Sequence, residues 1–170
     1  QREVLDPIDF LLRCADQGRI YREGVSVVIV GRPNVGKSSL LNAVLQEDRA
    51  LVTAIPGTTR DSIEEHVEIA GMPVRIADTA GIRDGADEVE ELGIQRARKL
   101  VNQADIVLFM IDGAAGIFAE DRQLFNTVAH KPVIVLVNKT DLLEKNAKID
   151  LSFFAEQLPK VMISAKEQAG

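Results

Sequence analysis

The 170-residue sequence contains a single cysteine, Cys14, and only 4% aromatic residues. One cysteine can form neither a disulfide nor a cysteine metal cluster within the chain, so both kinds of site are excluded. Because aromatic rings are scarce, valine, isoleucine, leucine and alanine must fill the interior. Apolar residues make up 46% of the chain, which is enough for the core of one domain. The lack of disulfides fits a reducing compartment, and we expect a cytoplasmic protein.

Long hydrophobic runs and an excess of positive charge are also missing. Unbroken apolar runs such as residues 106–111 are far too short to span a bilayer, and no signal peptide is visible, so we expect no membrane partner. The formal net charge of −6 argues against a broad basic surface for nucleic acid, although it leaves room for a local basic patch.

A glycine-containing stretch near the start of the chain has the spacing of a phosphate-binding loop. Residues 31–38 are Gly-Arg-Pro-Asn-Val-Gly-Lys-Ser, which fits the pattern GxxxxGKS. They follow an apolar run, residues 25–30, and precede residues 37–46, which have the composition of a helix. This order of strand, glycine loop and helix is the context that the motif requires, and it predicts a P-loop.

The residue types of this P-loop suit a nucleotide triphosphate. Gly31 and Gly36 let the backbone turn tightly, so that its N–H groups converge on phosphate oxygens. The positive N-terminal end of the following helix points at the same anion. Lys37 is predicted to bind the β- and γ-phosphates, and the hydroxyl of Ser38 is predicted to ligate Mg²⁺.

Strands and helices are predicted to alternate along the rest of the chain. The expected strands are residues 25–30, 63–69, 74–77, 106–111, 133–137 and 161–163, and the expected helices are 37–46, 91–101, 119–129 and a short one at 152–157. The pattern predicts an α/β fold of three αβα layers around a mostly parallel six-stranded sheet, with one antiparallel edge strand. Ligands of such folds bind at the carboxyl ends of the strands.

Two further groups of polar residues lie where this rule places them. Asp78 follows the predicted strand 74–77 and can hold Mg²⁺ directly or through water, while the N–H of Gly81 can face the γ-phosphate. Thr58 and Thr59 lie in the loop after the first helix of the P-loop unit, where a hydroxyl can complete the Mg²⁺ shell and sense the γ-phosphate. Alone, each pattern is also typical of an ordinary turn, and its position relative to the P-loop favours the functional interpretation.

Residues 138–141, Asn-Lys-Thr-Asp, are predicted to recognise the base. A carboxylate at Asp141 can accept both the N1–H and the N2 amino protons of guanine. Adenine offers neither, so it would leave the desolvation of that carboxylate uncompensated. Asn138 can tie this loop to the P-loop, the Lys139 stem can pack on the base, and a backbone N–H near Ala165 can meet guanine O6.

This ordered set of motifs resembles a Ras-like P-loop GTPase of the translation-factor-related class, over roughly residues 25–166. Within that class the chain most closely resembles the G domain of the MnmE (TrmE) family of tRNA-modification GTPases. The narrower match rests on residues 31–42, 55–61 and 78–83 and, most discriminating, on residues 87–97.

The resemblance implies an enzyme that hydrolyses GTP to GDP and phosphate and drives modification of the wobble uridine of tRNA. The implied partners are a second copy of the chain through the switch face, and, through the full-length protein, tRNA and the flavoprotein MnmG. Residues 1–23 are expected to be a lead-in helix and linker from a helical domain. Residues 24–170 are expected to be the GTPase domain without its last helix, so we expect a piece excised from a longer protein.

One departure from the Ras-like pattern affects the expected mechanism. Ile82 stands where these enzymes commonly place a glutamine that orients water, and its side chain forms no hydrogen bonds. The resemblance implies that K⁺ supplies the missing charge, that two G domains pair across their switch loops, and that Glu90 is the catalytic carboxylate. The implied K⁺ ligands are Asn34, Thr53, Ile55 and Thr58.

The complete assignment is as follows. The catalytic residues are Glu90, Lys37 and Thr59, and the Mg²⁺ ligands are Ser38 and Thr59. The residues assigned to GTP or GDP and its ions are Asn34, Val35, Gly36, Lys37, Ser38, Ser39, Thr53, Ala54, Ile55, Pro56, Gly57, Thr58, Thr59, Asp78, Thr79, Ala80, Gly81, Asn138, Lys139, Asp141, Ser164 and Ala165.

Two other functions share part of this pattern. A ribosome-assembly GTPase of the Der (EngA) type has the same P-loop and the same Pro-Gly-Thr-Thr-Arg-Asp loop, but residues 87–97 fit the first family better. A non-hydrolysing binding module or an adenylate-type P-loop kinase is the third alternative. Residues 138–141 argue against the kinase, and a nucleotide-specificity assay separates the two.

Overall fold

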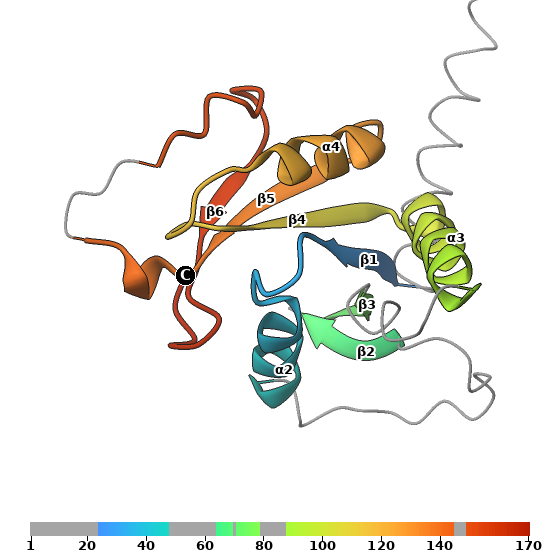
Figure 1. The fold of residues 1–170 in the computed structure, drawn as a ribbon. Helices are drawn as coiled ribbons and strands as arrows, with labels where there is room; N and C mark the ends of the chain where they lie inside the picture. Colours follow the sequence, from blue (N-terminus) through green and yellow to red (C-terminus); the bar gives the residue numbers. More distant parts are fainter. Residues whose placement is uncertain (1–23, 48–63, 70, 79–87, 145–148) are drawn as a thin grey trace, which may run out of the picture.

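The structure is a computed structural model that describes residues 24–47, 64–69, 71–78, 88–144 and 149–170 (Figure 1). Its centre is a six-stranded sheet with the strand order β2-β3-β1-β4-β5-β6. The strands are β1 (Val25–Val30), β2 (Glu64–Ile69), β3 (Met72–Asp78), β4 (Ile106–Asp112), β5 (Val133–Asn138) and β6 (Lys160–Met162). All neighbours are parallel except β2 and β3, so the predicted sheet with one antiparallel edge strand is confirmed.

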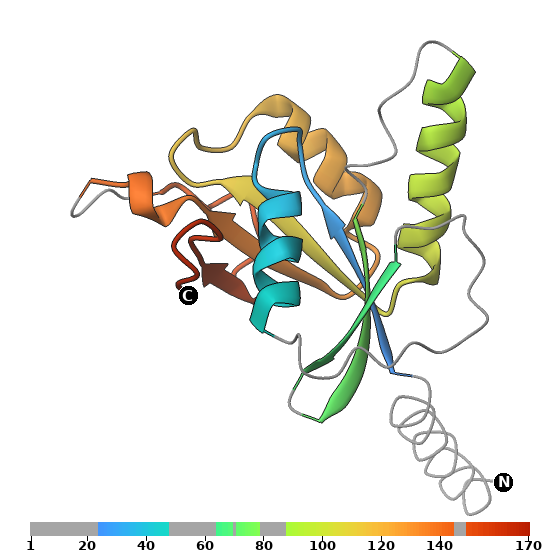
Figure 2. The ribbon, with the colours of Figure 1, turned by 90° about the horizontal axis from the view of Figure 1, so that it is seen from below.

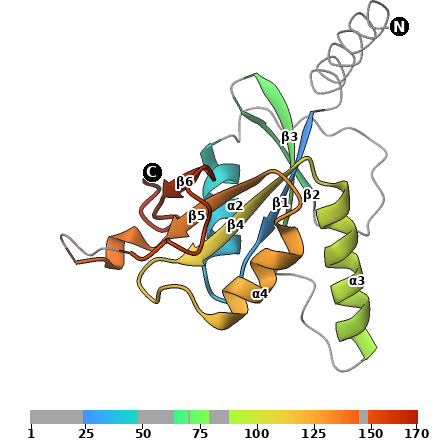
Figure 3. The same ribbon diagram turned by 90° about the horizontal axis from the view of Figure 1, so that it is seen from above.

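Helices cover both faces of the sheet. The α-helices within the described residues are α2 (Lys37–Glu47), α3 (Glu88–Gln103) and α4 (Ala119–Val128). Figures 2 and 3 show α2 on one face and α3 and α4 on the other. The predicted three-layer arrangement is therefore confirmed. Within the described residues, none of the helices combines the length and the hydrophobicity that a membrane span needs.

The alternation of side chains along the central strands separates the core into two layers. On β1, Val28 and Val30 belong to the cluster under α3 and α4, whereas Val27 and Ile29 pack with α2. Because both faces of these strands are buried, their sequences are apolar apart from Ser26 in β1 and the polar residues that end β4 and β5. This double burial fixes the carboxyl end of β1, from which the P-loop departs.

Four of the aromatic rings in the described residues pack against one another beneath α4. Phe109 of β4 meets Phe125 of α4 edge to face, with ring centroids 5.2 Å apart, and also meets Phe154 at 5.9 Å. Phe153 joins the same group at 5.6 Å from Phe125. Elsewhere the buried side chains are mainly aliphatic, as the composition predicts. The rings pack α4 and the segment of Phe153 and Phe154 against β4.

The predicted helix at residues 152–157 is wrong. The backbone makes two successive turns there, each closed by a hydrogen bond between residues three apart. The carboxylate of Asp150 accepts the N–H of Ser152 at 2.9 Å, which stabilises a turn in place of a helical start. The turns bring the consecutive rings of Phe153 and Phe154 onto the same apolar cluster, and this burial outweighs helix propensity.

The other helices and strands lie close to their predicted positions. Helix α3 begins three residues earlier than predicted, at Glu88, which places Glu90 in its first turn. An acidic first turn is favourable at the positive end of a helix, and this explains the longer helix. The predicted lead-in helix within residues 1–23 lies outside the described residues.

Candidate nucleotide-binding site

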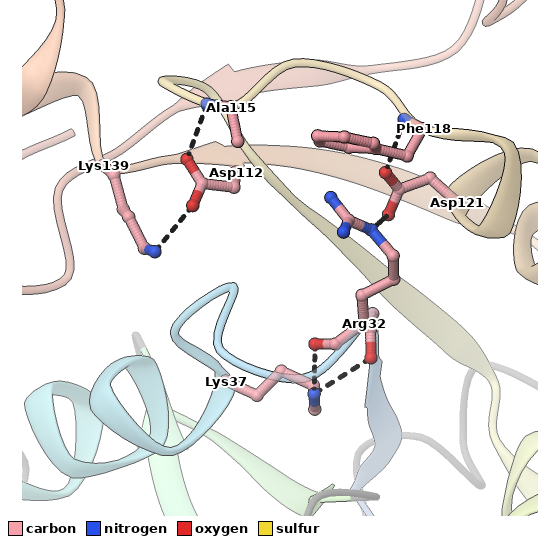
Figure 4. A network of polar contacts seen from close by, with 8 residues as sticks. Arg32, Lys37, Asp112, Ala115, Phe118, Asp121 and Lys139 are labelled. Carbon is pink, nitrogen blue, oxygen red and sulfur yellow. Dashed lines mark hydrogen bonds and ion pairs between the residues drawn. The ribbon is translucent and has the colours of Figure 1, made fainter.

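The P-loop, residues 31–38, connects β1 to α2 and closes around its own lysine. Lys37 is buried, and its Nζ donates hydrogen bonds to the carbonyl oxygens of Gly31, at 2.9 Å, and Arg32, at 2.7 Å (Figure 4). The ammonium group is thus held at the centre of the loop by main-chain atoms. A buried cation next to the N-terminus of α2 makes this loop suitable for anionic phosphates.

Both glycines of the P-loop lie against neighbouring segments. Gly36 has a φ of +105°, and a Cβ there would stand 2.2 Å from Nδ2 of Asn138. A Cβ on Gly31 would stand 2.4 Å from the carbonyl oxygen of Met110 in β4. The sequence predicts the tight turn, but it gives no sign that the glycines also make room for β4 and β5.

Asn138, at the end of β5, joins three parts of the site. Its Nδ2 donates to the carbonyl oxygen of Val35 at 2.7 Å, and its Oδ1 accepts the N–H of Ala165 at 2.9 Å. Only 3% of the residue is exposed. The predicted link to the P-loop is therefore present. The Ala165 amide that the sequence predicts for guanine O6 donates to Asn138 in this structure.

The base loop, residues 138–141, is held against the segment that follows β6. The N–H and the hydroxyl of Thr140 both donate to the carbonyl oxygen of Ile163, at 3.2 and 2.9 Å. Asp141 is exposed, and its Oδ1 accepts the hydroxyl of Ser164 at 2.6 Å. The buried Ser164 thus orients an exposed carboxylate at the rim of the site. An exposed carboxylate with a fixed direction can accept hydrogen bonds from a ligand at this rim.

Lys139 is paired with an acidic residue that the sequence analysis missed. Its Nζ lies 2.6 Å from Oδ2 of Asp112, the last residue of β4. Burial raises the pKa of Asp112, but hydrogen bonds from Lys139 and from the N–H groups of Ala115 and Ala114, with the charge of Lys139, outweigh it and hold the pKa below its ordinary value. The sequence feature that could have indicated Asp112 is its position directly after the predicted buried strand, residues 106–111.

Arg32 of the P-loop is paired with a second missed acid. Its Nε lies 2.7 Å from Oδ1 of Asp121, whose side chain is completely buried in the first turn of α4. The other carboxylate oxygen of Asp121 accepts the N–H of Phe118 at 2.9 Å. The guanidinium carbon of Arg32 also lies 4.3 Å from the centre of the Phe118 ring. These contacts fix the first turn of the P-loop on α4.

The expected Mg²⁺ ligands that the structure describes follow or end neighbouring inner strands of the sheet, β1 and β3. Ser38 is exposed in the first turn of α2. Asp78 ends β3 and pairs in register with Ile29, two residues before the P-loop. Hydroxyl and carboxylate oxygens are the ligands that Mg²⁺ prefers, so these residue types fit the ion.

The remaining assigned residues divide into two groups. Ser39 is exposed on α2, and Glu90 lies in the first turn of α3. The following lie outside the described residues: Thr53, Ala54, Ile55, Pro56, Gly57, Thr58, Thr59, Thr79, Ala80, Gly81 and Ile82.

A P-loop on a mostly parallel sheet, joined through a buried asparagine to a base loop, defines the class of GTP-binding P-loop domains. Residues 26–139 match the family model described as 50S ribosome-binding GTPase, and the chain belongs to this GTPase family.

Within that family the chain is similar over nearly its whole length to tRNA modification GTPases. It is 60% identical over 171 residues to "tRNA modification GTPase MnmE" of Desulfotalea psychrophila, covering 99% of this chain and 37% of that protein. A second MnmE, of Desulforamulus reducens, is 54% identical and is covered to 32% of its length. The predicted resemblance to the MnmE G domain is confirmed. The chain spans about a third of the length of these curated relatives.

Solved structures support the same fold. Era of Aquifex aeolicus, crystallised with GDP and aluminium fluoride, superposes with a TM-score of 0.66 and 32% identity, covering 85% of this chain and 52% of Era. The FeoB G domain of Methanococcus jannaschii, at 22% identity and a TM-score of 0.59, covers 86% of this chain and 89% of its own, and shows the fold alone.

Proposed function

We propose that this chain is the G domain of a tRNA-modification GTPase that binds GTP with Mg²⁺ and hydrolyses it to GDP and phosphate. The observation that carries the proposal is the position of Asn138. This buried side chain binds both the P-loop, at Val35, and the segment of Ala165, beside the base loop. Asn138 thereby holds the part of the site proposed for the phosphates at a fixed distance from the part proposed for the base.

In this proposal, different residues bind the phosphates, the base and the Mg²⁺ ion. Lys37, held by two main-chain carbonyls, lies ready to contact the β- and γ-phosphates. Asp141, oriented by Ser164, accepts the N1–H and N2 amino protons of guanine. Mg²⁺, held by Ser38 and Thr59 and organised by Asp78, would supply charge that balances the β- and γ-oxygens.

Hydrolysis in this proposal depends on a charge that the P-loop arginine does not supply. The Nε of Arg32 pairs with the buried Asp121, and its guanidinium lies over Phe118. The Arg32 side chain is therefore used in structural contacts, and an isoleucine side chain such as that of Ile82 has no group that could hydrogen-bond to water. We assign the missing charge to K⁺ held by Asn34, Thr53, Ile55 and Thr58. Asn34 is exposed with a φ of 64°, so its amide is accessible at the mouth of the P-loop.

Glu90 is the proposed carboxylate that orients the attacking water. Its backbone lies in the first turn of α3, twelve residues after Asp78, the last residue of β3. The proposal includes pairing of two G domains through the switch face, which completes the K⁺ site and the catalytic arrangement.

At the level of the whole protein, we propose that hydrolysis drives modification of the wobble uridine of tRNA in the cytoplasm. Support comes from relatives named tRNA modification GTPase MnmE that are 54% to 60% identical. The proposed partners are the flavoprotein MnmG and tRNA, both bound through parts of the full-length protein outside residues 24–170. Residues 1–23 are proposed to link this domain to a helical one.

A ribosome-assembly GTPase of the Der (EngA) type is the second candidate. The description of the matching family, 50S ribosome-binding GTPase, favours it. Residues 87–97 favour the first candidate. A basic RNA-binding domain directly after this one in the full-length protein would decide for the second.

The proposal is tested by measuring GTP hydrolysis against protein concentration in KCl and in NaCl. We expect the rate per molecule to rise with concentration in KCl and to stay low in NaCl, because K⁺ and a second G domain are both required. Equal rates in the two salts would exclude the K⁺ mechanism. A rate per molecule that is independent of concentration would exclude activation by pairing.

The role of Glu90 is tested with a neighbour as the control. Glu90→Ala is expected to abolish turnover in KCl while GTP affinity stays within roughly twofold, because a group that acts on water in the transition state contributes little to ground-state binding. Glu91→Ala removes the adjacent acid and is expected to retain activity. Unchanged turnover in Glu90→Ala removes this residue from the mechanism.

A further inference from the structure

The connection between β4 and α4, residues 112–121, carries one carboxylate at each end of the nucleotide site. Asp112, the last residue of β4, begins it and Asp121, in the first turn of α4, ends it, and each is paired with a basic residue of a different loop (Figure 4). The two pairs are separate in the structure, since no hydrogen bond or ion pair joins one pair to the other among the described contacts.

The Asp121 pair leads to the phosphate end through a continuous set of contacts. The buried carboxylate binds Nε of Arg32 at 2.7 Å, and the main-chain carbonyl of the same arginine accepts Nζ of Lys37 at 2.7 Å. Phe118 restrains the guanidinium plane from one side. Asp121 therefore fixes the residue that supplies one of the two carbonyl groups aiming Lys37.

The Asp112 pair leads to the base end. One carboxylate oxygen accepts the N–H groups of Ala114 and Ala115, at 3.0 and 3.1 Å, so the carboxylate itself is held in place. The other oxygen binds Nζ of Lys139, whose backbone has a φ of 65°. With both ends of the lysine fixed, its methylene stem has a defined direction across the base site.

We propose that the β4–α4 connection is a two-part positioning element of the nucleotide site. Asp121 is a positioning residue for the phosphate end and acts through Arg32 and Lys37. Asp112 is a positioning residue for the base end and acts through Lys139. The proposal rests on the proposed function, because it assigns parts of the same guanine-nucleotide site.

The test uses Asp121→Asn and Asp112→Asn as a matched pair, each with the wild-type shape and without the charge. A fluorescent guanosine diphosphate is bound to the chain and displaced with inorganic pyrophosphate or with guanosine. Asp121→Asn should weaken competition by pyrophosphate roughly tenfold and leave guanosine unchanged, since a charge-assisted hydrogen bond contributes about that factor. Asp112→Asn should show the reverse pattern.

The double variant separates positioning from folding, because Arg32→Met alone leaves the buried Asp121 carboxylate, which still accepts the N–H of Phe118, without its cationic partner. If Asp121 acts through Arg32, the double variant Arg32→Met/Asp121→Asn should lose no more pyrophosphate affinity than either single variant. A general loss of stability would instead weaken both competitors equally and lower the melting temperature.

Three outcomes overturn the proposal: equal losses for pyrophosphate and guanosine in both variants, additive losses in the double variant, or wild-type affinity throughout. If the wild-type chain binds no guanine nucleotide, the proposed function fails instead. Amide hydrogen exchange without nucleotide then tests the inference alone. Asp121→Asn should speed exchange in residues 31–37 with little change at 139–141, and unchanged exchange in the P-loop contradicts the inference.

Discussion

The phosphate end of the site is built into the core, whereas the base end is assembled from loops at the rim. At the phosphate end, Lys37 is 6% exposed, and the side chain of Asp121 is fully buried. At the base end, Asp141 is exposed, and the side chains of Lys139 and Asp112 are 31% and 14% exposed. Folding has already removed water from the charges of one end, while the carboxylate at the other end loses its water only when a ligand binds.

This difference assigns distinct tasks to the two ends. A phosphate site that is dehydrated and hydrogen-bonded before binding gains affinity without reorganisation. A carboxylate that must be desolvated on binding rejects any base that does not replace its water hydrogen bonds. Affinity is therefore expected to depend mainly on the phosphate end, and discrimination between bases mainly on the base end.

The largest effect should come from a change that breaks the contact between the two ends. In Gly36→Ala the new Cβ would stand 2.2 Å from Nδ2 of Asn138, at a φ of +105°. We expect a loss of about 3 kcal/mol in unfolding free energy, because backbone strain and displacement of a buried amide add. Guanine-nucleotide binding should be abolished.

Gly71→Ala is the control for this prediction. It has a similar positive φ of +79° in the β2–β3 turn, with nothing within 4 Å of the new Cβ. Only the strain remains there, about 1 kcal/mol, and nucleotide binding should be retained. Denaturant unfolding and nucleotide titration of the two variants measure the difference, and equal losses would mean that the contact with Asn138 is irrelevant.

A second change should alter base specificity and leave the phosphate end intact. Asp141→Asn keeps an oxygen that accepts the Ser164 hydroxyl, which lies 2.6 Å from the carboxylate. It replaces the other acceptor with a donor. We expect guanine nucleotides to bind roughly 100-fold more weakly and xanthine nucleotides, which carry a carbonyl at C2, to bind better. An unchanged ratio of GDP to xanthosine diphosphate affinity would contradict this role of Asp141.

The smallest effect concerns the ion pair of Asp112 and Lys139. Since the folded-state pKa of Asp112 lies below its ordinary value of 3.8, its contribution to stability is present above that value and is lost as the pH falls through the folded pKa. The contribution should stay under about 1 kcal/mol, because the pair is partly exposed. Comparing unfolding of wild type and Asp112→Asn from pH 7 to pH 3 measures it, and a difference that grows toward low pH would have the wrong sign.

The sequence predicts the fold well because the central strands show their burial directly. The apolar runs of β1, β4 and β5 and the alternation in β2 predict both the sheet and its exposed edge. The segment at residues 152–157 fails because its conformation depends on Phe153 and Phe154 meeting the distant Phe109 and Phe125. Local propensity carries no information about such contacts.

In the candidate site too, some residues can be predicted from local sequence, whereas others depend on contacts between distant parts of the chain. The residues proposed to touch the nucleotide, such as Lys37 and Asp141, lie in short motifs with fixed spacing, so the sequence alone predicts them. Asp112 and Asp121 belong to no motif, and their partners are 27 and 89 residues away along the chain. Their pairing depends on the order of strands in the sheet, which brings the end of β4 beside the ends of β1 and β5.

The central claim is that this chain carries one guanine-selective site whose phosphate and base ends are joined through Asn138. It is tested most directly by titrating the purified chain with GDP and with ADP in the presence of Mg²⁺ and comparing the two dissociation constants. We predict at least roughly 100-fold tighter binding of GDP, because adenine leaves the carboxylate of Asp141 without its partners. Equal affinity for the two nucleotides, or tighter binding of ADP, would contradict the claim.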